Sequence, residues 1–121
     1  GEPDALFRKV YRAVLDANLK ATEFIKTGVS SKAVYQIALK HIDDAGFKGK
    51  FTHGLGHGTG LAIHEAPRLS SMKETILEEG MLVTVEPGIY LPGQGGVRLE
   101  NQVVVRNDGP EVLNRLSFLN L

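Results

Sequence analysis

Histidines and glutamates suited to metal chemistry gather in the second half of the sequence. Three of the four histidines, His53, His57 and His64, lie within twelve residues. Glu86 and Glu100 follow in two separate apolar runs. An imidazole together with two carboxylates is a nitrogen and oxygen ligand set that suits Mn, Co, Zn or Fe. The chain has no cysteine, which excludes a thiolate zinc site and a thiol nucleophile.

Each of these residues, taken alone, also has a simpler interpretation. A single histidine beside glycines is more often a surface residue than a ligand, and a glutamate before proline is usually solvated. Glu100 shares one face of a predicted strand with Arg98 and Gln102, which fits the exposed face of a half-buried strand. An exposed pair of Arg98 and Glu100 would contribute at most about 1 kcal/mol to stability.

The glycines around His57 favour a combined site over these separate interpretations. Glycines alternate from Gly54 to Gly60, and glycine permits sharp bends of the backbone. In a regular strand His57 and His64 would face opposite sides, so the histidines converge only if the chain bends between them. A phosphate-binding loop is disfavoured, because no helix-forming segment follows the glycines and no lysine closes them.

The elements that must position these residues begin with two predicted helices. The first runs from Ala5 to Lys26, because Pro3 and Asp4 suit a helix start and Gly28 suits its end. The second begins at Ser30 or Ser31 and is stopped by Gly46. The spacing of apolar residues predicts a buried face made of Leu6, Val10, Val14, Leu15, Leu19, Phe24 and Ile25 in the first helix, and of Val34, Ile37, Ala38 and Ile42 in the second.

Short runs rich in β-branched residues predict strands in the second half. Glycine, proline and asparagine separate these runs as turn residues. Helices followed by strands, without alternation of the two, indicate an α+β fold in which helices cover one face of a mainly antiparallel sheet. The predicted strands are Leu61–His64, Met81–Glu86, Gly88–Leu91 and Val97–Arg106.

The composition excludes several classes of function. The chain has 121 residues, 42% of them hydrophobic, which is enough for one globular core. Lys and Arg balance Asp and Glu at 14 each, so no net charge favours nucleic acid or an anionic membrane as partner. No apolar run approaches the ~18 residues that cross a bilayer. The lack of cysteine fits a cytoplasmic location, and the lack of an initiating Met predicts that the chain belongs to a longer protein.

Three motifs, in order, resemble one family of peptidases. The run from Phe51 to Pro67 (FTHGLGHGTGLAIHEAP) is similar to the histidine segment of the Xaa-Pro dipeptidases, or prolidases, and of the aminopeptidases P. Glu79–Tyr90 (EGMLVTVEPGIY) and Gly96–Glu100 (GVRLE) resemble the two segments that follow it in that family. The resemblance covers essentially the whole chain and implies the pita-bread fold. Residues 1–121 would then be the C-terminal portion of a single catalytic domain, with its upstream portion missing.

For the metal site, the resemblance implies three ligands in this chain. His57 looks like the histidine ligand, Glu86 looks like a carboxylate ligand that also carries the proton of the attacking water, and Glu100 looks like the carboxylate that bridges two metals. The implied cofactors are two divalent ions, Mn or Co before Zn or Fe. Asn101 stands where the family often has aspartate, at a position that is not itself a ligand.

For the substrate, the resemblance implies four further residues. His53 and His64 resemble the catalytic histidines that hold the scissile amide and stabilise the tetrahedral intermediate, and Tyr90 and Arg98 fall where the family lines its substrate site. The implied reaction is hydrolysis of the bond between an N-terminal residue and proline by a hydroxide that bridges the metals. The implied partners are the peptide, the missing upstream segment and a second copy in a homodimer, with no nucleic acid and no membrane.

Two of the five protein ligands of the family have no counterpart in this sequence. They are aspartates on a hairpin upstream of the first helix. Glu86 and Glu100 bring two negative charges against the four positive charges of two divalent ions, which repel each other strongly at the usual separation of about 3.5–4 Å. The 121-residue chain alone is therefore predicted to be inactive and to bind metal weakly at best.

Two other classes of function stay open at this point. One is a non-catalytic pita-bread module that binds protein, and the other is a metal-free hydrolase resembling creatinase, with a histidine as general base. Both are disfavoured because the chain keeps every ligand that its span should contain. Metal analysis of the complete protein separates them from the peptidase.

Overall fold

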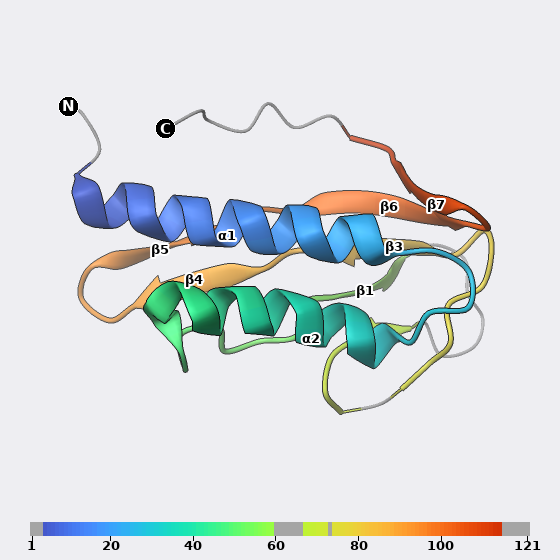
Figure 1. Cartoon of the computed structure of the whole chain (residues 1–121), viewed down its shortest axis with the longest axis horizontal. Helices are drawn as coiled ribbons and strands as arrows, with labels where there is room; N and C mark the ends of the chain where they lie inside the picture. Colours follow the sequence, from blue (N-terminus) through green and yellow to red (C-terminus); the bar gives the residue numbers. More distant parts are fainter. Residues whose placement is uncertain (1–3, 60–66, 73, 115–121) are drawn as a thin grey trace.

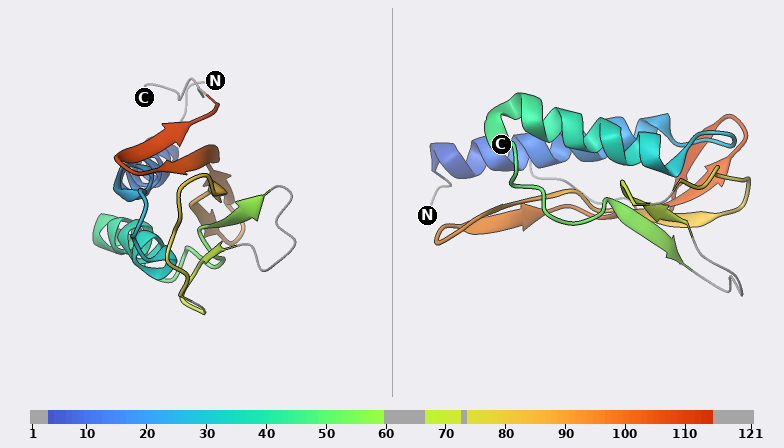
Figure 2. Two further views of the ribbon diagram at one scale, coloured as in Figure 1. Left: turned by 90° about the vertical axis from the view of Figure 1, so that its right-hand side faces the viewer. Right: turned by 90° about the horizontal axis from the view of Figure 1, so that it is seen from below.

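The computed structural model describes residues 4–59, 67–72 and 74–114. Its elements form two layers, with the helices on one side of the strands (Figures 1 and 2). Two α-helices come first, α1 (Ala5–Phe24) and α2 (Ser31–Ile42), and a short π-helical turn follows, η1 (Asp43–Phe47). The strands are β1 (Gly56–Thr59), β2 (Arg68–Leu69), β3 (Leu82–Val85), β4 (Gly88–Leu91), β5 (Gly95–Arg98), β6 (Asn101–Arg106) and β7 (Gly109–Val112).

The strands pair antiparallel throughout. Five of them form one sheet in the order β2-β1-β3-β6-β7, and β4 and β5 form a separate pair. The predicted α+β class, two helices followed by a mainly antiparallel sheet, is confirmed. Within the described residues, no helix has the length and hydropathy needed to cross a bilayer.

The two sheets are joined by one long two-stranded ribbon, in which β3 continues into β4 and β5 continues into β6. Val85 pairs with Asn101 at the end of β3, and Gly88 pairs with Arg98 at the start of β4. Two residues separate these pairs on each strand, so the same register places Glu86 opposite Glu100. The strand pairing is interrupted between these two pairs, and both candidate carboxylate residues lie in the interruption.

Helix α1 buries a narrower face than the apolar spacing predicts. Asp4 caps its start, because its carboxylate accepts a hydrogen bond of 2.7 Å from the Phe7 amide. Many of its buried side chains are small, and the full set is Val10, Tyr11, Ala13, Val14, Ala17, Asn18, Ala21 and Thr22.

The predicted buried face of α1 is wrong at three positions. Leu6, Leu19 and Phe24 keep 41%, 46% and 39% of their surface exposed. Leu6 and Phe24 lie in the first and last turns of α1, and Leu19 lies on the opposite side of the helix from the buried Val10. Val10, Val14 and Ile25 are buried as predicted, and Leu15 is half-buried.

Helix α2 follows the sequence prediction more closely. Ser30 is its N-cap, since the Ser30 hydroxyl accepts hydrogen bonds from the amides of Lys32 and Ala33 at 3.2 and 3.3 Å. Its predicted face is buried at Val34, Ala38 and Ile42, whereas Ile37 is half-buried. Gly46 ends the helical segment with a φ of +98°, a left-handed conformation that favours glycine.

The strand predictions need four corrections. The predicted run Val97–Arg106 is interrupted at Leu99 and Glu100, where β5 gives way to β6. The glycine segment, in which no strand was predicted, contains β1, a strand between β2 and β3. The neighbouring strand β2 was not predicted either. Strand β7 was not predicted; it holds Pro110 at the edge of the sheet, where a missing N–H is tolerated. The predicted strand Leu61–His64 lies outside the described residues.

Close packing explains why glycine occurs in β1. A Cβ atom added to Gly56 would overlap the carbonyl oxygen of Thr84 on the neighbouring strand β3. A residue with a side chain would push β1 away from β3. Glycine at this position therefore permits close approach of two strands.

Candidate metal and catalytic site

The helices cover one face of the ribbon and leave the other uncovered (Figure 2). The candidate polar residues lie on the uncovered face. Opposite residues of antiparallel strands place their side chains on the same face, and the face alternates along each strand. Val85 and Val103 are fully buried in the core. By alternation, Glu86 and Arg98 lie on the opposite face, and the register places Glu100 there as well.

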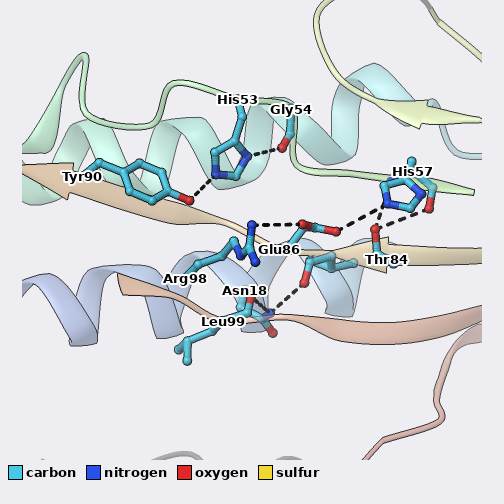
Figure 3. Close-up of polar contacts among 10 residues, drawn as sticks. Asn18, His53, Gly54, His57, Thr84, Glu86, Tyr90, Arg98 and Leu99 are labelled. Carbon is cyan, nitrogen blue, oxygen red and sulfur yellow. Dashed lines mark hydrogen bonds and ion pairs between the residues drawn. The ribbon is translucent and has the colours of Figure 1, made fainter. Parts of the chain in front are cut away.

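His57 and Glu86 face each other across β1 and β3 (Figure 3). The Nε2 atom of His57 lies 3.7 Å from Oε2 of Glu86. The Nδ1 atom of His57 lies 3.0 Å from the carbonyl oxygen of Gly58, which only accepts, so Nδ1 carries the proton. In the neutral ring this leaves the lone pair of Nε2 free to bind a metal ion, as in many metal-binding histidines.

The spacing of this pair fits a shared metal ion. Two donor atoms that each lie about 2.1 Å from one ion are at most about 4.2 Å apart, and the separation of His57 Nε2 and Glu86 Oε2 is 3.7 Å. A neutral imidazole and a carboxylate form the hard donor set that divalent Mn, Co, Zn or Fe accepts. These two residues could therefore hold one edge of a metal site.

Thr84 fixes the backbone of His57. The His57 amide donates a 3.0 Å hydrogen bond to the Thr84 hydroxyl, which in turn donates to the His57 carbonyl oxygen at 3.4 Å. Thr84 is only 3% exposed. Together with the close contact at Gly56, this clamp holds the histidine-bearing strand against the strand that leads to Glu86.

Arg98 lies on the other side of the Glu86 carboxylate. Its Nη1 atom is 3.9 Å from Oε1 of Glu86, while His57 faces Oε2. The Glu86 side chain is 17% exposed, against 56% for both Arg98 and His57. Glu86 thus sits between two basic groups, each directed at a different oxygen, with its carboxylate largely shielded from solvent.

A second pair of candidate residues, His53 and Tyr90, is joined by a hydrogen bond. His53 Nε2 lies 2.6 Å from the Tyr90 hydroxyl, and His53 Nδ1 lies 2.6 Å from the carbonyl of Gly54. Since that carbonyl only accepts, Nδ1 is the donor, and in the neutral ring the Tyr90 hydroxyl donates to Nε2. The Tyr90 side chain lies over Gly88 and Gly96, where an added Cβ would come within 2.5 Å of its hydroxyl oxygen and 2.7 Å of its ring, respectively.

The other two predicted site residues are Glu100 and His64. Glu100 is exposed and stands opposite Glu86 in the register, but no arrangement of three His, Asp or Glu side chains suited to metal binding occurs among residues 4–59, 67–72 and 74–114. His64 lies outside the described residues. The structure therefore brings together His57 with Glu86 and Arg98, and His53 with Tyr90.

Comparison with known proteins agrees with the motifs. The model of metallopeptidase family M24 matches residues 1–107. The chain belongs to this family. An Xaa-Pro dipeptidase of Pyrococcus furiosus is 44% identical over 115 residues, which make up 95% of this chain and 33% of that protein. This M24 chain thus spans about a third of the length of that relative.

Solved structures of similar proteins share its fold. The prolidase from Pyrococcus furiosus has a TM-score of 0.91 and 44% identity, and the match covers 97% of this chain and 35% of that one. The X-Pro aminopeptidase from Thermotoga maritima MSB8 has a TM-score of 0.92 and 39% identity, covering 98% and 34%. The expected pita-bread architecture is confirmed.

The motifs of the M24 family did not reveal Asn18. Its side chain, fully buried on α1, donates hydrogen bonds to the carbonyl oxygens of Val85 at 3.2 Å and Leu99 at 3.1 Å. Asn101 donates to the Asn18 side-chain oxygen at 2.8 Å. The available signal was a lone asparagine among the alanines of an amphipathic helix, at a position that turns out to lie on the buried face.

Proposed function

We propose that this chain contributes to the active site of a metal-dependent Xaa-Pro peptidase. The observation that carries the proposal is the pair of His57 and Glu86, with a free imidazole lone pair 3.7 Å from a shielded carboxylate. Membership of metallopeptidase family M24 and similarity to Xaa-Pro dipeptidases support it. The substrate would be a peptide with proline in second position.

The metal ligands in this chain would be His57, Glu86 and Glu100. Two divalent ions, Mn or Co before Zn or Fe, would supply Lewis acidity and make a water molecule acidic enough to attack near neutral pH. Glu86 would accept the proton of that water and return it to the leaving amine, because its carboxylate lies at the centre of the polar face. Arg98 would hold the second oxygen of Glu86 in place.

On the substrate side, the assigned residues are His53 and Tyr90, together with His64. Both ring nitrogens of His53 already have partners, the Gly54 carbonyl and the Tyr90 hydroxyl. For His53 to contact the scissile amide through Nε2, the substrate must replace the Tyr90 hydroxyl. Tyr90 would thereby keep the His53 ring oriented until substrate arrives.

The complete site would require more chain than these residues. Glu86 and Glu100 leave two of the four positive charges of the ions uncompensated, and two aspartates from an upstream segment of the same protein would balance them. We place this chain in the C-terminal portion of one catalytic domain, in a protein that is cytoplasmic and forms a homodimer. The 121 residues alone would then be inactive.

A Glu86→Gln substitution tests the proposal in the full-length protein with Mn²⁺ bound. Glutamine keeps the shape but removes the proton acceptor, so hydrolysis of an Xaa-Pro dipeptide should fall by at least about 100-fold in kcat. Glu111→Gln is the matched control, because Glu111 also pairs with an arginine, Arg106 at 2.9 Å, but on β7. Near-normal kcat in Glu86→Gln would refute the assignment.

Metal analysis separates the peptidase from the two alternatives. A metal-free creatinase-like hydrolase or a protein-binding module would need no divalent ion. Purified full-length protein should contain up to two Mn, Co, Zn or Fe ions per chain, and chelation should abolish hydrolysis. Hydrolysis that persists in metal-free protein would favour the creatinase-like alternative.

A further inference from the structure

A buried polar cluster lies directly beneath the interruption of the ribbon. Asn18 of α1 is fully buried, and its side-chain nitrogen donates to the carbonyl oxygens of Val85 and Leu99 at 3.2 and 3.1 Å (Figure 3). These carbonyls belong to opposite strands of the ribbon. One side chain therefore ties the two strands together at the point where their own ladder is interrupted.

Each of the two carbonyls belongs to the residue just before a candidate ligand. Val85 immediately precedes Glu86, and Leu99 immediately precedes Glu100. The register places Glu86 opposite Glu100. Asn18 thus fixes the peptide group that leads into each carboxylate residue, from the helix side of the ribbon, while the carboxylates lie on the other side.

Asn101 sets the orientation of the Asn18 amide. The Asn101 side-chain nitrogen donates to the Asn18 side-chain oxygen at 2.8 Å, and Asn101 is only 4% exposed. With its oxygen held in this way, the NH2 group of Asn18 must face the two carbonyls. Rotating the amide by 180° would turn its oxygen to both carbonyl oxygens, which is unfavourable in a buried site.

We propose that Asn18 is a positioning residue of the metal site, which sets the relative placement of Glu86 and Glu100. The inference rests on the proposed function, since it assigns Asn18 to the residues that would hold the ions. Asn18 itself touches neither metal nor substrate. A purely structural role would lower stability alone, whereas a positioning role also changes metal affinity and turnover in the folded protein.

The test compares Asn18→Leu and Asn18→Asp with Thr22→Val in the full-length protein. Leucine keeps the volume without any donor, and aspartate keeps the shape and the acceptor for Asn101 but loses both donors to the carbonyls. Thr22 is the matched control, because it lies one turn further along the buried face of α1 and its hydroxyl has no hydrogen-bond partner. Circular dichroism first establishes a temperature at which every variant is folded.

At that temperature, Mn²⁺ binding is measured by calorimetry, and kcat and KM are measured with an Xaa-Pro dipeptide. Both Asn18 variants should bind Mn²⁺ about 10- to 100-fold more weakly and lose a similar factor in kcat, the usual effect of removing a group that orients a metal ligand. KM should change much less. The absorption spectrum of Co²⁺ bound in the site should also shift, whereas Thr22→Val should match the parent in all four measurements.

Mn²⁺ affinity and kcat equal to the parent in a folded Asn18 variant would overturn the inference. If neither Asn18 variant folds, Asn101→Ala decides, because it keeps Asn18 and removes the group that holds the Asn18 amide in its orientation. It should weaken Mn²⁺ binding by a smaller factor, and an unchanged affinity would count against Asn18. A parent protein that neither binds Mn²⁺ nor hydrolyses the peptide would refute the proposed function instead.

Discussion

At the scale of single residues, hydrogen bonds to backbone carbonyls decide which ring nitrogen of each histidine is free. The Nδ1 atom of His57 donates a hydrogen bond to the Gly58 carbonyl oxygen, and Nδ1 of His53 donates one to the Gly54 carbonyl oxygen. Both rings therefore present Nε2, but His57 presents it to a carboxylate and His53 to a phenol. The same local geometry thus gives one histidine suited to a metal and another suited to a neutral partner.

A Tyr90→Phe substitution tests the role of that phenol. Phenylalanine keeps the ring over Gly88 and Gly96 but frees His53 Nε2. Without this hydrogen bond the substrate itself must order the His53 ring, and an ordering cost of about 1 kcal/mol should lower kcat/KM for an Xaa-Pro dipeptide by about fivefold. Mn²⁺ affinity should not change, because His53 is not a proposed ligand. Activity and calorimetry on the full-length protein check both expectations.

The control for this substitution is Tyr35→Phe. Tyr35 packs on Phe51 at 5.8 Å between ring centroids, and Phe51 packs edge-on against His53 at 5.0 Å. The control therefore removes a hydroxyl from the same aromatic cluster without touching His53 Nε2. A fall in kcat/KM of equal size in Tyr35→Phe would show that the Tyr90 hydrogen bond has no specific role.

At the scale of elements, close contact between β1 and β3 holds the histidine strand beside Glu86. Gly56 permits this contact, because a Cβ there would overlap the Thr84 carbonyl oxygen. Gly56→Ala should therefore destabilise the full-length protein by about 3 kcal/mol, as overpacking against a backbone does. Chemical denaturation measures this change.

Gly54 offers the comparison within the same glycine segment. A Cβ added to Gly54 would meet its nearest neighbours at 3.4 and 3.5 Å, close to ordinary contact. Gly54→Ala should change the free energy of unfolding by less than about 1 kcal/mol. Equal losses in Gly54→Ala and Gly56→Ala would mean that chain flexibility, and not the contact between strands, accounts for the effect at Gly56.

The elements also show how far sequence reasoning reaches. Capping residues Asp4 and Ser30 placed the helix starts correctly, because a cap acts through bonds to its own first turn. The predicted buried face of α1 is wrong at Leu19, because Leu19 lies on the opposite side of the helix from Val10. The role of Asn18 was not predictable either, since its partners lie 67 and 81 residues away along the chain.

In the candidate site, too, the residue types were predictable from motifs, whereas some of the contacts between them were not. The motifs pointed to His57, Glu86 and Arg98, and the fold brings these three side chains together. The pairing of His53 with Tyr90 depends on two glycines that clear space for a ring, and no motif states that contact. Glu100 was assigned by motif, and the register places it opposite Glu86.

At the scale of the whole molecule, the charge on the site predicts how the 121-residue chain behaves alone. Glu86 and Glu100 cannot neutralise two divalent ions, so one weak Mn²⁺ site at most is expected. Its affinity should be more than about 100-fold below that of the full-length protein, because ligands and not only orienting groups are lost. Calorimetry with Mn²⁺ on both proteins measures the difference. Two tight sites on these residues alone would contradict the charge argument.

The continuous register of the ribbon has a consequence for the order of folding. Glu86 and Glu100 are brought opposite each other by a hairpin that closes at Gln94, whose amide bonds the Leu91 carbonyl at 2.9 Å. Such local closure is fast, whereas His57 and Asn18 must arrive from distant parts of the chain. We therefore expect Glu86 and Glu100 to come to lie opposite each other early in folding. His57 and the side-chain amide of Asn18 would reach them only as the last tertiary contacts form.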